Sequence, residues 1–306
     1  EIGVLKEMSK DTSLFRTANL AQKEAIGAAG YNYYSQKGIS EIKGGGGIWI
    51  HDYVSLVGLI QQNPDPKLLG ILNVKYLVSD LELKSGNLNL VGKFNACKEC
   101  AVWNAFGPYL YKNDDFVPRY ILVPNAILLA GDEDLAKQLS FWILQNIDVK
   151  NTVVLYTKSL NELTQSLLEK FSIVVILKAQ NDYEIRINQQ ILSSLNETSN
   201  NDFAGVLKKL SGKYKELKVN DYKNNRVALE LYGESGWIAA SERFAHFPGW
   251  KASMNAHNLN MFKANNAFTG LRIDGEKGEL VFGYYPHSYK KGRLITLTAF
   301  FAVILY

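Results

Sequence analysis

Between residues 119 and 179, extended apolar runs alternate with helical patterns, and this alternation restricts the fold more than any other feature. The runs RYILVPNAILLAG, NTVVLYTK and SIVVILKA predict strands, and DEDLAKQLSFWILQN and SLNELTQSLLEKF between them predict helices. Ser159 opens the second helix with Glu162 three residues later, which is the pattern of a capping box. Strands that alternate with helices predict a parallel sheet, so we expect an α/β domain over 68–181.

The C-terminal part of the chain has a different period. From about residue 214, polar and apolar residues alternate, and turn dipeptides such as Asp274-Gly275 separate the runs. This pattern predicts an antiparallel β-sandwich domain over 214–291. The predicted fold class is therefore α+β, an N-terminal helical and α/β layer with a small, mostly parallel sheet, followed by the sandwich.

Two further regions are expected to be mostly helical. Residues 1–67 predict a helical and loop-rich entry region, with one helix over 13–30 opened by Ser13 and a second over 48–62. Residues 182–213 predict a helical linker between the α/β domain and the sandwich.

The composition excludes two broad classes of protein. Of the 306 residues, 47% are hydrophobic and 21% are charged, which is typical of a globular chain and not of a disordered one. The net charge of +4 is small, and no run of Lys and Arg is longer than two residues. The sequence therefore predicts no nucleic-acid partner.

The last residues are uniformly apolar. The 13 residues from Leu294 to Tyr306 contain no charge, and as a helix they would span about 20 Å at about 1.5 Å per residue. A bilayer core is about 30 Å thick, so the segment is either part of the core or the first two-thirds of a membrane helix. Its lack of periodicity favours the start of a transmembrane helix over 292–306, with the preceding KKGR as an interfacial anchor.

Cys97 and Cys100 form a single C-x-x-C motif, which allows a redox pair, half of a zinc site or a small structural disulfide. The flanking residues resemble a loop or hairpin, so a local disulfide in an oxidising compartment is favoured. A zinc site would need two more ligands, and the histidines have no paired spacing. The histidines are His51, His246, His257 and His287.

No motif demands a catalytic residue, a cofactor or a metal. The chain lacks a G-x-S-x-G elbow, and the glycines of 44–47 lack the Lys-Ser/Thr of a nucleotide loop. The acidic groups at 114–115 and 132–134 are better explained by turns and helix capping than by acid–base chemistry. Asn196 begins the tripeptide NET, which is a candidate glycosylation acceptor.

The stretch FPGWKASMNAHNLNMFKANNAFTGLRI, residues 247–273, predicts strands joined by turns. Its Trp250 and His257, with Tyr284 and Tyr285 farther on, are the candidate substrate-binding residues. Such aromatic side chains either stack on sugar rings or fill the core and rim of a sandwich. Both interpretations remain open at this point.

Three segments carry a family resemblance: Phe15–Gly38, Leu68–Asp80 with the motif NVKY, and Phe247–Pro286 with PGWKA. Together they resemble the extracytoplasmic C-terminal region of YfhO-type proteins, which are polytopic bacterial membrane proteins of the GT-C glycosyltransferase type. The chain has NAHN where the family has a DG turn, and WIHDY at Trp49–Tyr53 is not the acceptor motif of the oligosaccharyltransferase relatives.

The resemblance implies that a membrane helix follows directly. It also implies that the catalytic carboxylate and the lipid-phosphate site lie in a membrane portion N-terminal to this segment. No residue here is therefore expected to be catalytic.

We accordingly expect an extracytoplasmic domain at a cell membrane, which positions an acceptor or supports assembly at the cell envelope. Its expected partners are membrane lipid through the C-terminal helix, a glycan or lipid-linked sugar, and envelope proteins. The alternative is a non-enzymatic cell-surface sandwich that binds glycans or proteins and is anchored by a C-terminal helix. A third hypothesis is a thiol–disulfide protein that uses Cys97 and Cys100.

Overall fold

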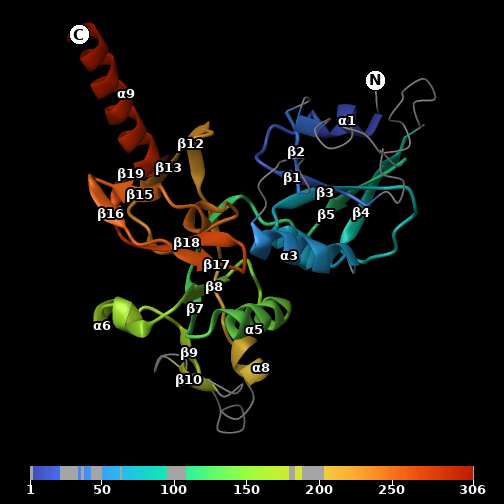
Figure 1. Cartoon of the computed structure of the whole chain (residues 1–306). Coiled ribbons are helices and arrows are strands. Elements are labelled where there is room, and N and C mark those ends of the chain that lie inside the picture. The colour runs from blue at the N-terminus through green and yellow to red at the C-terminus, as the bar shows by residue number, and fades with distance from the viewer. Residues whose placement is uncertain are drawn as a thin grey trace.

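The computed structural model describes residues 3–20, 34–35, 38–42, 50–62, 64–94, 108–178, 183–187 and 203–305. The expected disulfide between Cys97 and Cys100 and the expected glycosylation at Asn196 lie outside the described residues. Within these ranges the fold is α+β, as expected from the sequence, with sheets rich in antiparallel strands (Figure 1).

The first sheet belongs to the N-terminal region and has five strands. Their order is β2 (Ser40–Glu41), β1 (Arg16–Asn19), β3 (Val74–Ser79), β5 (Tyr109–Asn113) and β4 (Leu88–Lys93). The expectation of a helix over 13–30 is wrong at Arg16–Asn19, because the backbone of this segment pairs with β3 and β2. The Thr17 hydroxyl also donates to the Tyr76 carbonyl oxygen at 3.0 Å, so tertiary pairing decides the conformation.

The helices of this region are α1 (Gly3–Met8), α3 (His51–Gln62) and α4 (Pro66–Ile71). The Asp65 carboxylate accepts a hydrogen bond from the Lys67 backbone and caps α4, and Pro66 occupies its first turn. Asn73 then turns the chain with a φ of 63° and leads directly into β3. Local signals at Asp65, Pro66 and Asn73 therefore account for the short helix and the start of the strand.

The second sheet has nine strands and runs through the centre of the molecule. Their order is β10 (Tyr183–Ile187), β9 (Ile173–Leu177), β7 (Asn125–Ala130), β8 (Thr152–Thr157), β17 (Phe262–Ala264), β18 (Phe268–Asp274), β14 (Ser235–Ala240), β6 (Tyr120–Val123) and β11 (Lys215–Glu216). Only β9, β7 and β8 pair in parallel, and the strands on either side pair antiparallel. The expected parallel sheet is thus the centre of a larger mixed sheet.

This sheet joins two regions that the sequence separates. Lys263 of β17 pairs with Tyr156 of β8, so strands from 68–181 and from 214–291 share hydrogen bonds and one core. The strands therefore do not divide between these two ranges as the expected domain boundaries imply. The hydrophobic pattern of a strand specifies which of its faces is buried but not which strand it pairs with. The pattern alone therefore does not determine whether a strand pairs within its own range or with the other range.

The helices around the parallel strands differ in part from expectation. Helix α5 (Glu133–Asn146) is capped by Asp132 and follows β7 as expected. The helix expected after Ser159 is divided into the 3₁₀ turn η2 (Leu160–Glu162) and α6 (Gln165–Leu168). Thr164 causes the division, because its hydroxyl caps a new helix start by accepting from the Leu167 backbone at 3.3 Å.

The expected helical linker over 182–213 is wrong at 183–187 and is helical only at 203–207 among its described residues. Tyr183–Ile187 is strand β10, which pairs antiparallel with β9, and α8 (Phe203–Leu207) is only five residues long.

The third sheet is entirely antiparallel and completes the expected sandwich. Its order is β12 (Lys218–Lys223), β13 (Arg226–Tyr232), β19 (Lys277–Tyr284), β15 (Trp250–Met254) and β16 (His257–Leu259). Its inner face packs on β6, β14 and β18 of the second sheet. The side chains buried between them include Tyr120, Leu122, Leu229, Ile238, Leu271, Leu280 and Phe282.

Helix α9 (His287–Leu305) follows β19 and extends away from the sheets (Figure 1). Its large apolar side chains are exposed. They are Leu294, Ile295, Leu297, Phe300, Phe301, Val303 and Ile304. Among the described helices, none combines the length and the apolar character that crossing a membrane requires.

Candidate functional site: an aromatic groove on the β-sandwich

A groove lies where the β12–β13 hairpin faces the connection from β14 to β15. It encloses about 350 Å³, which is within the usual range of about 300–1,000 Å³ for small-molecule sites. Aromatic and charged side chains line it together. They include Tyr222, Lys223, Glu242, Arg243, Phe244 and Trp250.

The aromatic side of the groove comes from a three-residue repeat. Phe244, Phe247 and Trp250 are spaced by three along the chain, and all three line the groove. Phe244 lies in the 3₁₀ turn η5 (Phe244–His246), where residues three apart lie on one side. Trp250 begins β15 directly afterwards, so the turn and the strand present their rings to the same space.

Trp250 is held by a chain of ring contacts that reaches the sandwich core. Its ring centroid lies 5.5 Å from that of Tyr284 and 4.4 Å from that of Phe244. Phe244 lies 4.7 Å from Phe282, which in turn stacks on Tyr120 at 6.5 Å. Because the inner rings are buried, Trp250 has a fixed orientation, with its ring only partly covered.

The chain approaches Trp250 through a glycine that the fold requires. Gly249 has a φ of 106°, and a Cβ atom there would lie 3.0 Å from the Cα of Pro286. Its carbonyl oxygen accepts a hydrogen bond from the Tyr285 backbone at 2.6 Å. This close approach joins the start of β15 to the segment that leads into α9.

A buried ionic cluster lies beside the groove. The Glu242 carboxylate lies 3.3 Å from Arg16 and 3.4 Å from Arg119, and it accepts a hydrogen bond from the Tyr222 hydroxyl at 2.9 Å. Burial and the Glu242 charge both raise the pKa of Tyr222, so its hydroxyl stays protonated and able to donate. Burial disfavours the charge on Arg16, but the nearby Glu242 raises the pKa of Arg16, which stays protonated.

Arg119 is the best-connected member of this cluster. Its side chain is only 3% exposed, and it donates to Asn73 Oδ1 at 3.0 Å, to the Tyr222 hydroxyl at 2.7 Å and to the Phe15 carbonyl at 3.1 Å. These partners come from the first sheet and its connections and from the third sheet. Arg119 therefore fixes the N-terminal region against the sandwich beside the groove.

The structure brings together some of the residues that the sequence singled out. Trp250 lines the groove, and Tyr284 contacts it from outside at 40% exposure. Tyr285 is 54% exposed and lies beside them, next to Gly249. His257 lies apart, because it pairs with Met254 at the far end of β15, four residues or about 13 Å from Trp250.

Sequence reasoning missed the polar side of the groove and its buried support. Tyr222, Glu242 and Arg243 line the groove, with Arg16 and Arg119 behind Glu242. The spacing of Phe244, Phe247 and Trp250 was a usable signal for the aromatic side. No local pattern links Arg16 and Arg119 to Glu242, because only the folded chain brings them within 4 Å.

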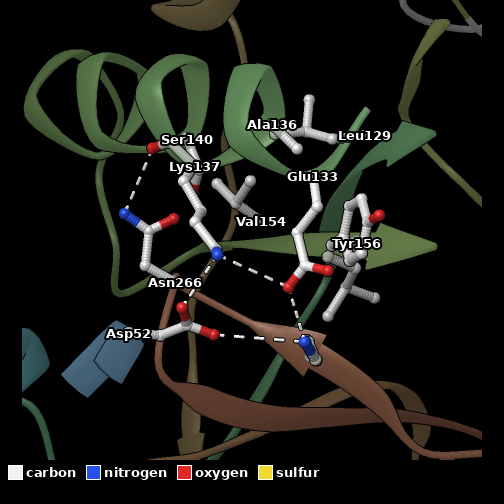
Figure 2. Close-up of a pocket in the computed structure, with 11 residues that line it drawn as sticks. Asp52, Leu129, Glu133, Ala136, Lys137, Ser140, Val154, Tyr156 and Asn266 are labelled. Carbon is white, nitrogen blue, oxygen red and sulfur yellow. Dashed lines mark hydrogen bonds and ion pairs between the residues drawn. The ribbon is translucent and has the colours of Figure 1, made fainter. Parts of the chain in front are cut away.

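A second pocket lies between α5, β8 and β17, and Figure 2 shows a ring of alternating charges in it. Lys137 Nζ lies 2.9 Å from Asp52 and 3.5 Å from Glu133. Lys263 Nζ lies 2.6 Å from Glu133 and 4.0 Å from Asp52. The ring therefore closes with two cations and two carboxylates, and its formal charges cancel.

His246 extends this ring, with Nδ1 3.6 Å from Asp52. Burial and the nearby Lys263 lower the pKa of His246, although Asp52 opposes them, so the imidazole is neutral near pH 7. The space enclosed here is about 20 Å³, room for about one water molecule. The ring joins α3, α5, β17 and η5, and we interpret it as a structural junction.

Comparison of the chain with protein-family models, with curated proteins and with solved structures gave no match.

Proposed function

We propose that the chain is a sugar-binding extracytoplasmic domain at a cell membrane. Its groove holds a glycan or lipid-linked sugar as an acceptor for a glycosyltransferase-like protein of the GT-C type, and the domain itself carries no catalytic carboxylate. The membrane and the GT-C parent are inferred from the resemblance of the NVKY and PGWKA segments. The sugar is inferred from the groove.

The observation that carries the proposal is the fixed, partly covered ring of Trp250 in a groove with charged walls. Indole rings stack on the apolar faces of sugars and stay rigid with few rotatable bonds. The polar walls supply hydrogen-bonding groups for the sugar hydroxyls. A groove of about 350 Å³ has room for one or two sugar rings.

The exposed apolar surface of α9 supports the membrane part of the proposal. Its large apolar side chains are exposed, none of them belongs to a described hydrophobic cluster, and the helix begins three residues after Tyr284. On soluble proteins, large patches of exposed apolar surface mark sites that interact with membranes or other proteins. Insertion of α9 into lipid would place the groove close to the membrane surface, where a lipid-linked sugar is presented.

Sugar binding is tested with the full chain on a printed array of neutral and acidic oligosaccharides. We expect the wild-type chain to bind a subset of the printed oligosaccharides. The affinity of W250A for these oligosaccharides should be at least tenfold lower, because stacking on the indole is removed. W142A is the matched control, since Trp142 is exposed on α5 and stacks on Phe203, away from the groove residues. The proposal fails if the wild-type chain binds none of the oligosaccharides, or if W250A binds them with the same affinity as W142A.

The membrane contact is tested by sedimentation of the full chain with phosphatidylglycerol–phosphatidylcholine vesicles. We expect the wild-type chain to sediment with the vesicles and the double variant F300D/F301D to remain in solution. Both phenylalanines are exposed, so the substitutions disturb no described core. Equal sedimentation of the two chains would contradict the membrane contact and leave the sugar groove unaffected.

A further inference from the structure

One cation in the groove has no anionic partner. Within the described residues, no carboxylate lies within 4.0 Å of the Arg243 guanidinium, and its side chain donates no hydrogen bond to the protein. Its carbon Cζ lies 4.7 Å from the centroid of the Tyr53 ring. Tyr53 thus covers one face of the planar group, and no described protein acceptor takes its N–H donors.

The carboxylate that lines the groove beside Arg243 already has partners. Glu242 precedes Arg243 in the chain and lines the same groove, but its oxygens face Arg16, Arg119 and the Tyr222 hydroxyl. Arg243 lines this end of the groove, and the guanidinium groups of Arg16 and Arg119 lie behind it against Glu242. The surplus of positive charge is only partly exposed to water, so it favours an incoming anion.

The cation and the aromatic platform belong to one chain segment. Arg243 and Phe244 are adjacent, Phe244 contacts Trp250, and all three line the groove. A ligand that stacks on Trp250 can therefore reach Arg243 with a charged substituent. The planar guanidinium fits the two oxygens of a carboxylate or a phosphate in a bidentate contact.

We propose that the groove selects acidic sugars, meaning a sugar ring that carries a carboxylate or phosphate, and that Arg243 binds this anionic group. This inference rests on the proposed sugar-binding function and adds the chemical class of the ligand. Arg243 sets the preference for the charged sugar, and Trp250 supplies the stacking that charged and neutral sugars share.

The test is isothermal titration calorimetry of the full chain with three matched ligands at low salt. They are a neutral hexose oligosaccharide found to bind on the array, the same oligosaccharide ending in a uronic acid, and the same oligosaccharide ending in a phosphate monoester. We expect at least one acidic ligand to bind about 10- to 100-fold more tightly than the neutral one, as a charge-assisted contact gives. The two acidic ligands distinguish a carboxylate from a phosphate.

R243Q is expected to abolish this preference by lowering the affinity for the acidic ligands much more than the affinity for the neutral one. A merely structural role for Arg243 would weaken all three ligands equally, and that result would overturn the inference. If R243Q does not fold, as judged by circular dichroism, R243K replaces it. Lysine keeps the charge but loses the planar fork, so we expect a preference several-fold smaller than in the wild type, and an unchanged preference would overturn the inference.

The outcomes separate the two proposals. A wild-type chain that binds neutral and acidic ligands equally well refutes the role of Arg243 and retains the sugar groove. A wild-type chain that binds no sugar refutes the proposed function itself. Raising the salt concentration should weaken only the acidic ligands, because screening acts on the Arg243 contact and not on stacking.

Discussion

The Arg119 guanidinium lies 3.4 Å from the Glu242 carboxylate, and the two residues are separated by more than a hundred positions in the sequence. Arg119 also supplies hydrogen bonds to Asn73, Tyr222 and the Phe15 carbonyl. The pair therefore links the N-terminal sheet to the sandwich at the place where the groove forms. Removing either partner is costly, because both charges are shielded from most of the solvent and the remaining charge would be poorly compensated.

Replacing Arg119 by methionine should lower the free energy of unfolding by about 3–5 kcal/mol, because Glu242 loses one of its two cations while Asn73 Oδ1 and the Phe15 carbonyl lose a buried donor. Urea denaturation of the full chain measures this. R186M is the control, because Arg186 is 63% exposed in its pair with Glu184, and such pairs contribute about 0–1 kcal/mol. An R119M chain as stable as R186M would show that the buried cluster does not stabilise the fold.

Asp52, Glu133, Lys137 and Lys263 form the charge ring, so we expect substitutions in different elements of the ring to have coupled effects on the free energy of unfolding. K137M leaves Asp52 and Glu133 without one of their two shared cations, so we expect it to destabilise the fold by about 1–3 kcal/mol. D52N should be less harmful in the K137M background than in the wild type, because the charge it removes has already lost its partner. A double-mutant cycle by urea denaturation measures the coupling energy, and strictly additive effects would contradict the ring.

Asp11 gives a pH-dependent contribution to stability. Burial alone would raise its pKa, but hydrogen bonds from Lys75, Ser13 and Tyr76 outweigh burial and hold the pKa well below its usual range. A depressed folded-state pKa stabilises the protein above the unfolded-state value of about 3.9, and this stability is lost as the pH falls through and below it.

We therefore expect D11N to be less stable than the wild type at pH 6 by about 1 kcal/mol, as for a partly exposed hydrogen-bonded charge. The difference should shrink steadily between about pH 5 and pH 2. Thermal denaturation of both chains across this range measures it. A difference that stays constant would show that Asp11 stabilises the fold by packing and not by charge.

Gly249 should tolerate no side chain. An alanine there would keep a φ of 106° and place its Cβ atom 3.0 Å from Pro286 Cα and 3.1 Å from the Tyr284 ring. We expect G249A to destabilise the fold by about 1–3 kcal/mol and to change the Trp250 fluorescence, since the start of β15 must move.

G58A is the matched control for this substitution, because Gly58 lies within α3 and a Cβ atom there meets nothing within 4 Å. It should be neutral or stabilise the chain by up to about 1 kcal/mol. If G249A matched G58A in stability and fluorescence, the close packing around Trp250 would be refuted.

Elements with strong local signals were predictable from the sequence. The capped helix at 66–71, the strand at 74–79 and the helix that begins after Asp132 all follow local rules of capping and periodicity. Elements without such signals were not. Arg16–Asn19 is a strand only because β3 and β2 pair with it, and the helix expected after Ser159 is divided by the second cap at Thr164.

The sequence by itself determined the α+β class, the parallel strands at 125–177, the sandwich strands after 214 and the aromatic identity of Trp250 and Tyr284. Only the tertiary structure decided that one nine-stranded sheet joins the two regions, and that Glu242 pairs with Arg16 and Arg119 while no described carboxylate pairs with Arg243. The physical reason is distance along the chain. Periodicity and capping act over a few residues, whereas strand partners and buried ion pairs are selected only when the collapsed chain brings distant segments together.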